Sequence, residues 1–256
     1  MIDLHCHILH GFDDGAHTFE DSLAMARMAA ADGIRTVVAT PHSPRSFACR
    51  HYEPALIRQS VNELNAALRA EDMPLEVIPG TEIAYESGVD QRLKQGLILP
   101  YGDSRTILFE PPYGALPPTF DTAIFTLQVA GYRVLLAHPE RIPDVQENPN
   151  RLRPLVERGV LVQITAAALT GGQGEQLERV SVALLTHGMA HVLASDAHGT
   201  RPPRTPQLAA ARDRAAELLD PQAAEALVHG TPLRLLTNQP FVLPIPRRID
   251  HRHWHR

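Results

Sequence analysis

Short apolar runs alternate with helical patterns along the chain, and this alternation restricts the possible fold more than any other feature. The runs predict seven strands, over Ile2–Cys6, Thr36–Thr40, Glu76–Ile83, Thr106–Phe109, Arg133–Ala137, Leu161–Thr165 and His191–Ser195. Most are rich in Val, Ile and Leu without polar alternation, which is typical of strands buried on both faces. A helix or long loop follows each run, so we expect the strands to pair in parallel.

The helices between these runs have recognisable starts. Thr18, with Asp21 three residues later, predicts a capping box at the start of a helix over Phe19–Asp32. Thr205 precedes a proline and predicts another capped start. Strands that alternate with helices in this way favour a distorted (β/α) barrel with seven strands, and an open doubly wound sheet is the alternative.

The length of the chain indicates one domain. A chain of 256 residues with 44% hydrophobic residues can form one substantial core, and α/β barrels of about 250 residues are commonly single domains. We therefore expect one domain over residues 1–240 and an extended tail over residues 241–256, where the sequence becomes rich in Pro and Arg. The alternating histidines His251, His253 and His255 in this tail favour adventitious metal binding or disorder over catalysis.

Six of the seven predicted strands end in residues that bind metals. In the first strand, His5 and His7 alternate, so they point to the same side and can share an ion. Other candidate ligands at or after strand ends are Asp14, His42, Glu82, Glu110, His138, Asp196 and His198. The carboxyl ends of parallel strands meet at one edge, and charges crowded there are costly without cations. These positions predict a metal centre at the C-terminal ends of the strands.

The same motifs resemble a known group of enzymes. The D-x-H-x-H start at Asp3, the histidine in Thr40-Pro41-His42, the G-x-E ending at Glu82, His138-Pro139 and the S-D-x-H ending at His198 are similar to the PHP (polymerase and histidinol phosphatase) superfamily. Asp13-Asp14-Gly15 and Phe109-Glu110 narrow the resemblance to bacterial tyrosine-protein phosphatases of capsular and exopolysaccharide operons. This resemblance implies a distorted seven-stranded barrel and three metal ions.

The resemblance also implies which residues hold each ion. The first ion would be bound by His5, His7, Glu82 and Asp196, the second by a bridging Glu82 with Glu110 and His138, and the third by Asp14, His42 and His198. Glu110 and Asp14 stand where other PHP branches have histidine. Histidine and carboxylate ligands without cysteine suit manganese, iron, zinc or magnesium, and we expect manganese first.

The expected chemistry is hydrolysis of a phosphate monoester. A bridging carboxylate holds two ions about 3.5–4 Å apart, and a water between them loses a proton near neutral pH and becomes the nucleophile. Arg141 and Arg201 are the candidates to grip the phosphate, with Arg204 as the alternative to Arg201. A phenolate leaving group, with a pKa of about 10, needs no dedicated general acid. Asp13 and His10 are weak candidates for that role.

Structural interpretations also apply to Asp3 and to the two cysteines, Cys6 and Cys49. Asp3 either orients a ligand histidine or is simply the first polar residue of its strand. Cys6 lies between two proposed ligands, so alternation points it into the core. A cysteine-dependent tyrosine phosphatase needs an arginine six positions after its cysteine, and those positions hold Phe12 and Ala55, so that mechanism is excluded.

The composition argues against nucleic-acid-binding proteins and membrane-spanning proteins. The net charge of −5 gives no sign of nucleic-acid binding, and no apolar run approaches the roughly 20 residues that span a bilayer. Two cysteines and the lack of a signal-peptide pattern favour the cytoplasm. The resemblance implies a phosphatase for phosphotyrosine on a bacterial tyrosine kinase, with possible homo-oligomers. A histidinol-phosphate phosphatase, a non-catalytic metal-binding scaffold and a nuclease are the alternatives.

Overall fold

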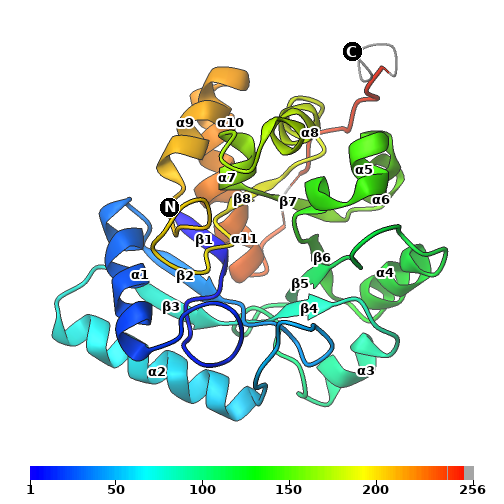
Figure 1. The fold of residues 1–256 in the computed structure, drawn as a ribbon. Helices are drawn as coiled ribbons and strands as arrows, with labels where there is room; N and C mark the ends of the chain where they lie inside the picture. Colours follow the sequence, from blue (N-terminus) through cyan, green and yellow to red (C-terminus); the bar gives the residue numbers. More distant parts are fainter. Residues whose placement is uncertain (241, 251–256) are drawn as a thin grey trace.

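The computed structural model describes residues 1–240 and 242–250. Its strands lie in the middle of the molecule and helices surround them (Figure 1). The strands are β1 Ile2–Cys6, β2 Thr36–Ala39, β3 Glu76–Pro79, β4 Glu82–Ala84, β5 Thr106–Glu110, β6 Arg133–Leu136, β7 Leu161–Thr165 and β8 Val192–Ala194. The pairings between them are all parallel, as the continuous apolar runs predict.

Helices connect the successive strands except β3 and β4, and further helices follow the last strand. The α-helices are α1 Phe19–Ala31, α2 Pro54–Ala70, α3 Val89–Lys94, α4 Phe120–Val129, α5 Pro143–Glu147, α6 Arg153–Glu157, α7 Ala166–Leu169, α8 Glu175–Thr186, α9 Ala209–Leu218, α10 Pro221–Glu225 and α11 Thr231–Leu236. Short 3-10 or π turns cover Pro139–Arg141, Pro149–Leu152 and Ala226–Gly230. Each parallel pair is therefore joined by a crossover, as such pairs require.

The two expected helix starts have different outcomes. The capping box of α1 is confirmed, because the Thr18 side chain accepts a hydrogen bond from the backbone of Asp21 and the Asp21 carboxylate accepts one from the backbone of Thr18. The start expected at Thr205 is wrong, since α9 begins at Ala209. Asp32, at the end of α1, accepts hydrogen bonds from the N–H groups of Ala209 and the residue before it. A distant carboxylate therefore satisfies the free donors at this helix start.

The third expected strand, Glu76–Ile83, is wrong as a single strand. It breaks at Gly80 and Thr81 into β3, which pairs with β2, and β4, which pairs with β5. A Cβ on Gly80 would lie 2.8 Å from a side-chain carbon of Val38 and 2.9 Å from one of Tyr101. Only glycine fits such a close passage, and the break lets the chain change partners there.

The two resulting sheets, β1–β2–β3 and β4–β5–β6–β7–β8, meet through single bridges. His42, just after β2, pairs with Glu82 at the start of β4, and Cys6 pairs with Ala197 just after β8. The backbone N–H of His7 also donates to the carbonyl of Ala197. The two contacts with Ala197 hold the C-terminal ends of the first and last strands side by side.

The strands change from apolar to polar toward their C-terminal ends. The smaller of two hydrophobic clusters contains Leu108 of β5 and Leu161 of β7, and Leu235 of α11 packs into it. Side chains two positions apart on a strand share a face. The next residues on that face are Glu110 and Gln163, both buried. The polar site therefore sits directly above an apolar layer.

The described part of the tail, residues 242–250, contains no helix or strand, yet it packs on the molecule. Ile249 is 5% exposed and exchanges hydrogen bonds between its backbone and the Asn150 side chain, and the Arg247 N–H donates to the carbonyl of His187. The histidines expected at 251–255 lie outside the described residues. Among the helices of the described chain, none combines the length and apolar character that crossing a bilayer requires.

Candidate metal centre

The predicted ligands lie together at or just beyond the C-terminal ends of the strands. β1 and the loop after it supply His5, His7 and Asp14, the loop after β2 supplies His42, β4 and β5 supply Glu82 and Glu110, and the segments after β6 and β8 supply His138, Asp196 and His198. They form overlapping groups whose ligand atoms lie within 4.8 Å of one another. Asp14 is exposed, His198 is half-buried, and the others are buried. The tertiary structure thus brings all of the predicted ligands to one place.

The first group joins β1 to the end of β8. His5 Nε2 lies 3.3 Å from Glu82 Oε2, 3.3 Å from Asp196 Oδ1 and 3.2 Å from His7 Nε2. His7 Nε2 lies 3.3 Å from Glu82 Oε2 and 3.5 Å from Asp196 Oδ1. Two imidazole nitrogens and two carboxylate oxygens therefore converge on one point, which is the donor set expected for the first ion.

Glu82 is the central carboxylate of the site. Its Oε1 lies 2.8 Å from His138 Nε2, and its Oε2 lies 3.1 Å from His42 Nδ1. Glu110 Oε2 lies 4.0 Å from the same nitrogen of His42. Since the two oxygens of Glu82 face different histidines, this side chain has the geometry of a bridge between two neighbouring ion positions.

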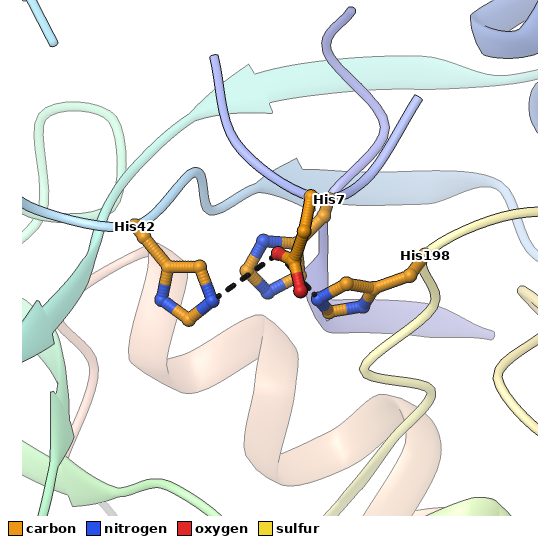
Figure 2. Close-up of side chains that lie close together, drawn as sticks. His7, His42 and His198 are labelled. Atoms are coloured by element: carbon orange, nitrogen blue, oxygen red, sulfur yellow. Dashed lines mark ion pairs between the residues drawn. The ribbon is translucent and has the colours of Figure 1, made fainter. Parts of the chain in front are cut away.

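A third group lies nearest to the solvent. Figure 2 shows the rings of His7, His42 and His198 turned toward one another. Asp14 Oδ1 lies between two of them, 3.6 Å from His42 Nε2 and 3.2 Å from His198 Nε2. The rings of His7 and His198 have centroids 3.9 Å apart. The expected ligands of the third ion therefore converge, with His7 beside them.

The nitrogen and oxygen atoms that converge in this site are suited to binding cations. His42 Nδ1, Glu82 Oε2, Glu110 Oε1 and His198 Nε2 are buried and have no partner in hydrogen-bonding geometry. Unpartnered polar atoms are costly in a protein interior, and a cation would offset that cost. Burial, followed by the charge of Glu82, raises the pKa of Glu110 to about 9. An all-nitrogen and oxygen donor set of this kind suits manganese, iron, zinc or magnesium.

The backbone is constrained where ligands leave the strands. His138 has φ of 31° and Asp196 has φ of 50°, in the left-handed region that residues other than glycine rarely adopt. A Cβ on Gly15 would lie 2.2 Å from the carbonyl oxygen of His7, so the loop after β1 can pass the ligand only as glycine. The left-handed backbone at His138 and Asp196 directs these side chains differently from the regular backbone of a β-strand.

Two buried residues hold the ligand histidines in place. Asp13 Oδ2 lies 2.6 Å from His7 Nδ1 and accepts a hydrogen bond from the backbone of His42 at 3.0 Å. Gln163 Oε1 lies 3.1 Å from His5 Nδ1. Sequence reasoning missed Gln163 and considered Asp13 only as a weak acid candidate. A glutamine inside the apolar strand β7 was the available signal, because buried polar groups need partners.

Asp3 does not orient a ligand ring. Its Oδ1 accepts hydrogen bonds from the backbone N–H groups of Ser195 at 3.0 Å and His5 at 3.3 Å, and its Oδ2 accepts one from the Ser195 hydroxyl at 2.5 Å. Burial raises the pKa of Asp3 to about 6. Asp3 therefore fastens β1 to the end of β8, and Cys6 packs into the hydrophobic core as expected.

Two arginines contact the candidate ligand Asp196. An Arg141 nitrogen lies 2.6 Å from Asp196 Oδ2, and an Arg204 nitrogen lies 2.8 Å from Asp196 Oδ1. Burial alone would raise the pKa of Asp196, but Arg141 and His5 outweigh it and hold that pKa well below its usual range. Arg201 is exposed and lines a surface cavity with Arg204 and His198. Its expected role in binding phosphate stays a prediction.

The match to a protein family decides the identity of the chain. The family described as capsular polysaccharide synthesis, CpsB/CapC, matches residues 1–237. The chain belongs to the CpsB/CapC family. The resemblance read from the strand-end motifs is thereby confirmed. Since the match extends from the first strand to α11, it includes every proposed ligand of the metal centre.

Relatives of this CpsB/CapC chain are tyrosine-protein phosphatases. YwqE of Bacillus subtilis (strain 168), a tyrosine-protein phosphatase, is 42% identical over 201 residues, which cover 78% of each protein. CapC of Staphylococcus aureus, a putative tyrosine-protein phosphatase, is 31% identical over 198 residues and 77% of each protein. The tyrosine-protein phosphatase CpsB of Streptococcus pneumoniae is 27% identical over 248 residues, covering 93% of this chain and 99% of CpsB.

Solved structures extend the comparison. One from a study of YwqE and CpsB, described as metal-dependent tyrosine phosphatases, matches with a TM-score of 0.92 and 37% identity over 98% of this chain and 100% of that one. The histidinol phosphate phosphatase of Lactococcus lactis, complexed with zinc, histidinol and phosphate, has a TM-score of 0.56 at 15% identity over 87% of this chain and 93% of that one. The similarity to the Lactococcus lactis enzyme shows a shared fold and nothing more. The CpsB/CapC chain thus has an α/β fold with parallel sheets like those of PHP-type enzymes.

Proposed function

We propose that this CpsB/CapC chain is a metal-dependent protein-tyrosine phosphatase. The observation that carries this proposal is the convergence of histidine and carboxylate donors from separate chain segments on one buried region, with two arginines beside it. Membership of a family whose named relatives are tyrosine-protein phosphatases supports the same activity. Hydrolysis of a phosphate monoester is the reaction that such a site suits best.

We assign the fold to a distorted seven-stranded (β/α) barrel with its metal centre at the C-terminal ends of the strands. The bridges His42–Glu82 and Cys6–Ala197, which link the two sheets, support the closed arrangement. In this assignment β3 and β4 are two halves of one broken barrel strand. Active sites of such barrels lie at this end, where loops from many strands meet.

Three ions would occupy the centre, with manganese as the first choice and iron, zinc or magnesium as alternatives. The first would lie between His5, His7, Glu82 and Asp196, the second between Glu82, Glu110 and His138, and the third between Asp14, His42 and His198. When bound, such cations supply Lewis acidity, which activates water and neutralises charge on the phosphoryl oxygens. The overlapping groups of converging donors support this number of ions.

The chain's own residues position the substrate and the ligands. Arg141 and Arg204 each carry further N–H donors beyond those on Asp196, and a guanidinium can grip phosphate oxygens in a bidentate fork. Asp13 contacts the Nδ1 atom of His7 and Gln163 contacts that of His5, which leaves the Nε2 atoms of both histidines for cations. Hydrolysis transfers the phosphoryl group to water and releases the tyrosine phenolate, which leaves without a dedicated acid.

The substrate we propose is phosphotyrosine on a bacterial tyrosine kinase of capsule or exopolysaccharide synthesis, in the cytoplasm. The family description, capsular polysaccharide synthesis, supports this setting. Fold alone does not fix a substrate, so the distinction between protein and small-molecule phosphates depends on the site. A histidinol-phosphate phosphatase is the second candidate, which the shared fold with the Lactococcus lactis enzyme favours.

A comparison of substrates tests the proposal. The metal-loaded protein is assayed on a phosphotyrosine peptide and on histidinol phosphate, with metal content measured in the same preparation. We expect a clear preference for the peptide and loss of activity with chelator. A preference for histidinol phosphate would overturn the substrate assignment. Metal binding without turnover of either substrate would support a non-catalytic scaffold instead.

A further inference from the structure

Two large aromatic side chains stand in solvent beside the metal centre. Phe47 is 84% exposed and Tyr113 is 67% exposed, yet their rings contact each other with centroids 5.5 Å apart and planes tilted by 54°. Phe47 lies on the loop that follows the ligand His42, and Tyr113 lies on the loop that follows the ligand Glu110. The pair therefore spans two loops that both supply the site.

Tyr113 lies close to the centre. Burial, followed by the charge of Glu110, raises the pKa of the Tyr113 phenol, and the charge of Arg141 lowers it. Tyr113 thus lies near Glu110 and also contacts the Phe47 ring. Because Tyr113 is 67% exposed, its ring offers apolar surface to a ligand that approaches the centre.

Folding alone does not account for this pair. Burial of apolar area stabilises a protein by about 25 cal/mol per Å², and Phe47, at 84% exposure, gains little of it. Single exposed apolar residues are ordinary on protein surfaces, as Phe125 on α4 is at 59% exposure. Two rings in contact across separate loops at the edge of a charged site are different, because apolar area gathered there indicates a ligand.

We propose that Phe47 and Tyr113 form the face that receives the phenyl ring of the phosphotyrosine substrate, which rests on the proposed phosphatase function. In phosphotyrosine a single oxygen joins phosphorus to the ring. A phosphate held at the centre and by Arg141 therefore places the ring at the mouth, where the aromatic pair lies. Aromatic rings attract one another in offset or edge-to-face arrangements. An alkyl phosphate has no aromatic ring that could contact this face. The face therefore favours the binding of aryl phosphates over alkyl phosphates.

Binding of two phosphonates tests the role of the ring face without turnover. Metal-loaded wild-type protein and the variants Phe47→Ala, Phe47→Tyr and Phe125→Ala are titrated with phenylphosphonate and methylphosphonate by calorimetry. The wild-type protein should bind phenylphosphonate more tightly than methylphosphonate. Phe47→Ala should reduce that preference about three- to tenfold, because one aromatic contact is lost. Phe47→Tyr keeps the ring, so it should retain the preference.

The control variant and the metal content show whether the effect is confined to the ring face. Phe125→Ala should leave both affinities unchanged, and metal content should be equal in all four proteins. An unchanged preference in Phe47→Ala, or equal weakening of both phosphonates, would overturn the inference. A preference that is already absent from the wild-type protein would also overturn it. Failure of the wild-type protein to hydrolyse a phosphotyrosine peptide would instead defeat the proposed function, because the phosphonate titration does not depend on turnover.

Discussion

Gln163 Oε1 contacts two of the proposed ligand residues at once, lying 3.1 Å from His5 Nδ1 and 3.3 Å from the backbone nitrogen of His138. Gln163 is fully buried in the middle of β7, a strand from which none of the proposed ligands comes. An amide oxygen only accepts hydrogen bonds, so His5 carries its proton on Nδ1 and keeps Nε2 free for a cation. The same oxygen holds the left-handed backbone of His138.

Removing this acceptor should weaken metal binding. Gln163→Met keeps the length of the side chain but cannot accept from His5, so we expect metal affinity to fall about 10- to 100-fold. Competition with a chromophoric chelator measures the change. Gln59→Met, on the exposed face of α2, is the matched control and should bind metal like the wild type. Equal affinities in wild type and Gln163→Met would show that His5 needs no such partner.

Asp196→Asn should remove the first ion. Asp196 is fully buried and faces His5 and His7, and an amide is a poorer ligand than a carboxylate. We expect loss of about one ion per chain and a fall in turnover of more than about 100-fold, because the ions act together on one phosphate. Elemental analysis and phosphotyrosine hydrolysis check these outcomes. A variant with full activity would place Asp196 outside the site.

Metal binding should release a proton from Glu110. The pKa of Glu110 is raised to about 9, so without cations this side chain is protonated at about pH 7.5, and a cation requires the carboxylate. Metal affinity should therefore increase with pH up to about 9. Calorimetry in buffers of different ionisation enthalpy measures the protons released. Glu110→Gln should release fewer protons than wild type, and equal release would assign the proton elsewhere.

Arginine substitutions should distinguish the two candidates after β8. Arg204 contacts the Asp196 carboxylate at 2.8 Å, whereas Arg201 is exposed. We expect Arg204→Ala to lower kcat/KM for phosphotyrosine peptide about 10-fold or more and Arg201→Ala to lower it less, because a buried charged hydrogen bond contributes more than an exposed one. Arg141→Ala should resemble Arg204→Ala. A larger effect at Arg201 would identify that residue as the phosphate ligand.

Stability should decline in mild acid through His191. Burial lowers its pKa from 6.5 to about 4, and its Nδ1 accepts a hydrogen bond from the backbone N–H of Val162. The unfolded chain therefore binds a proton here at a higher pH than the folded chain. The stabilisation is complete above about pH 6.5 and decreases as pH falls toward 4, by up to about 3 kcal/mol.

The variant His191→Asn isolates this contribution. Asparagine keeps an acceptor for Val162 but does not titrate, so the free energy of unfolding should change less between about pH 7.5 and about pH 5 than it does in the wild type. Urea unfolding in the presence of chelator measures both proteins without the metal contribution. An equal loss of stability in both proteins would assign the acid sensitivity to other groups.

Local patterns predicted the bounds of two strands that run without a break. The runs at Ile2–Cys6 and Leu161–Thr165 have the expected bounds because each is buried on both faces throughout. The run Glu76–Ile83 divides because its two halves pair with different strands, and no local pattern records that change. The same limit explains Thr205, since the actual cap of α9 comes from Asp32, a residue far earlier in the chain.

The sequence by itself determined the chemical type of the candidate metal ligands and their places at or after the ends of most strands, because residue chemistry and strand periodicity are local properties. Only the tertiary structure decided which side chains support those ligands. Gln163 and Asp13 serve His5 and His7 through contacts made by packing β7 and a loop against β1, and Phe47 meets Tyr113 across two loops. Such pairings depend on distances between segments far apart in the chain, and those distances are set only when the chain folds.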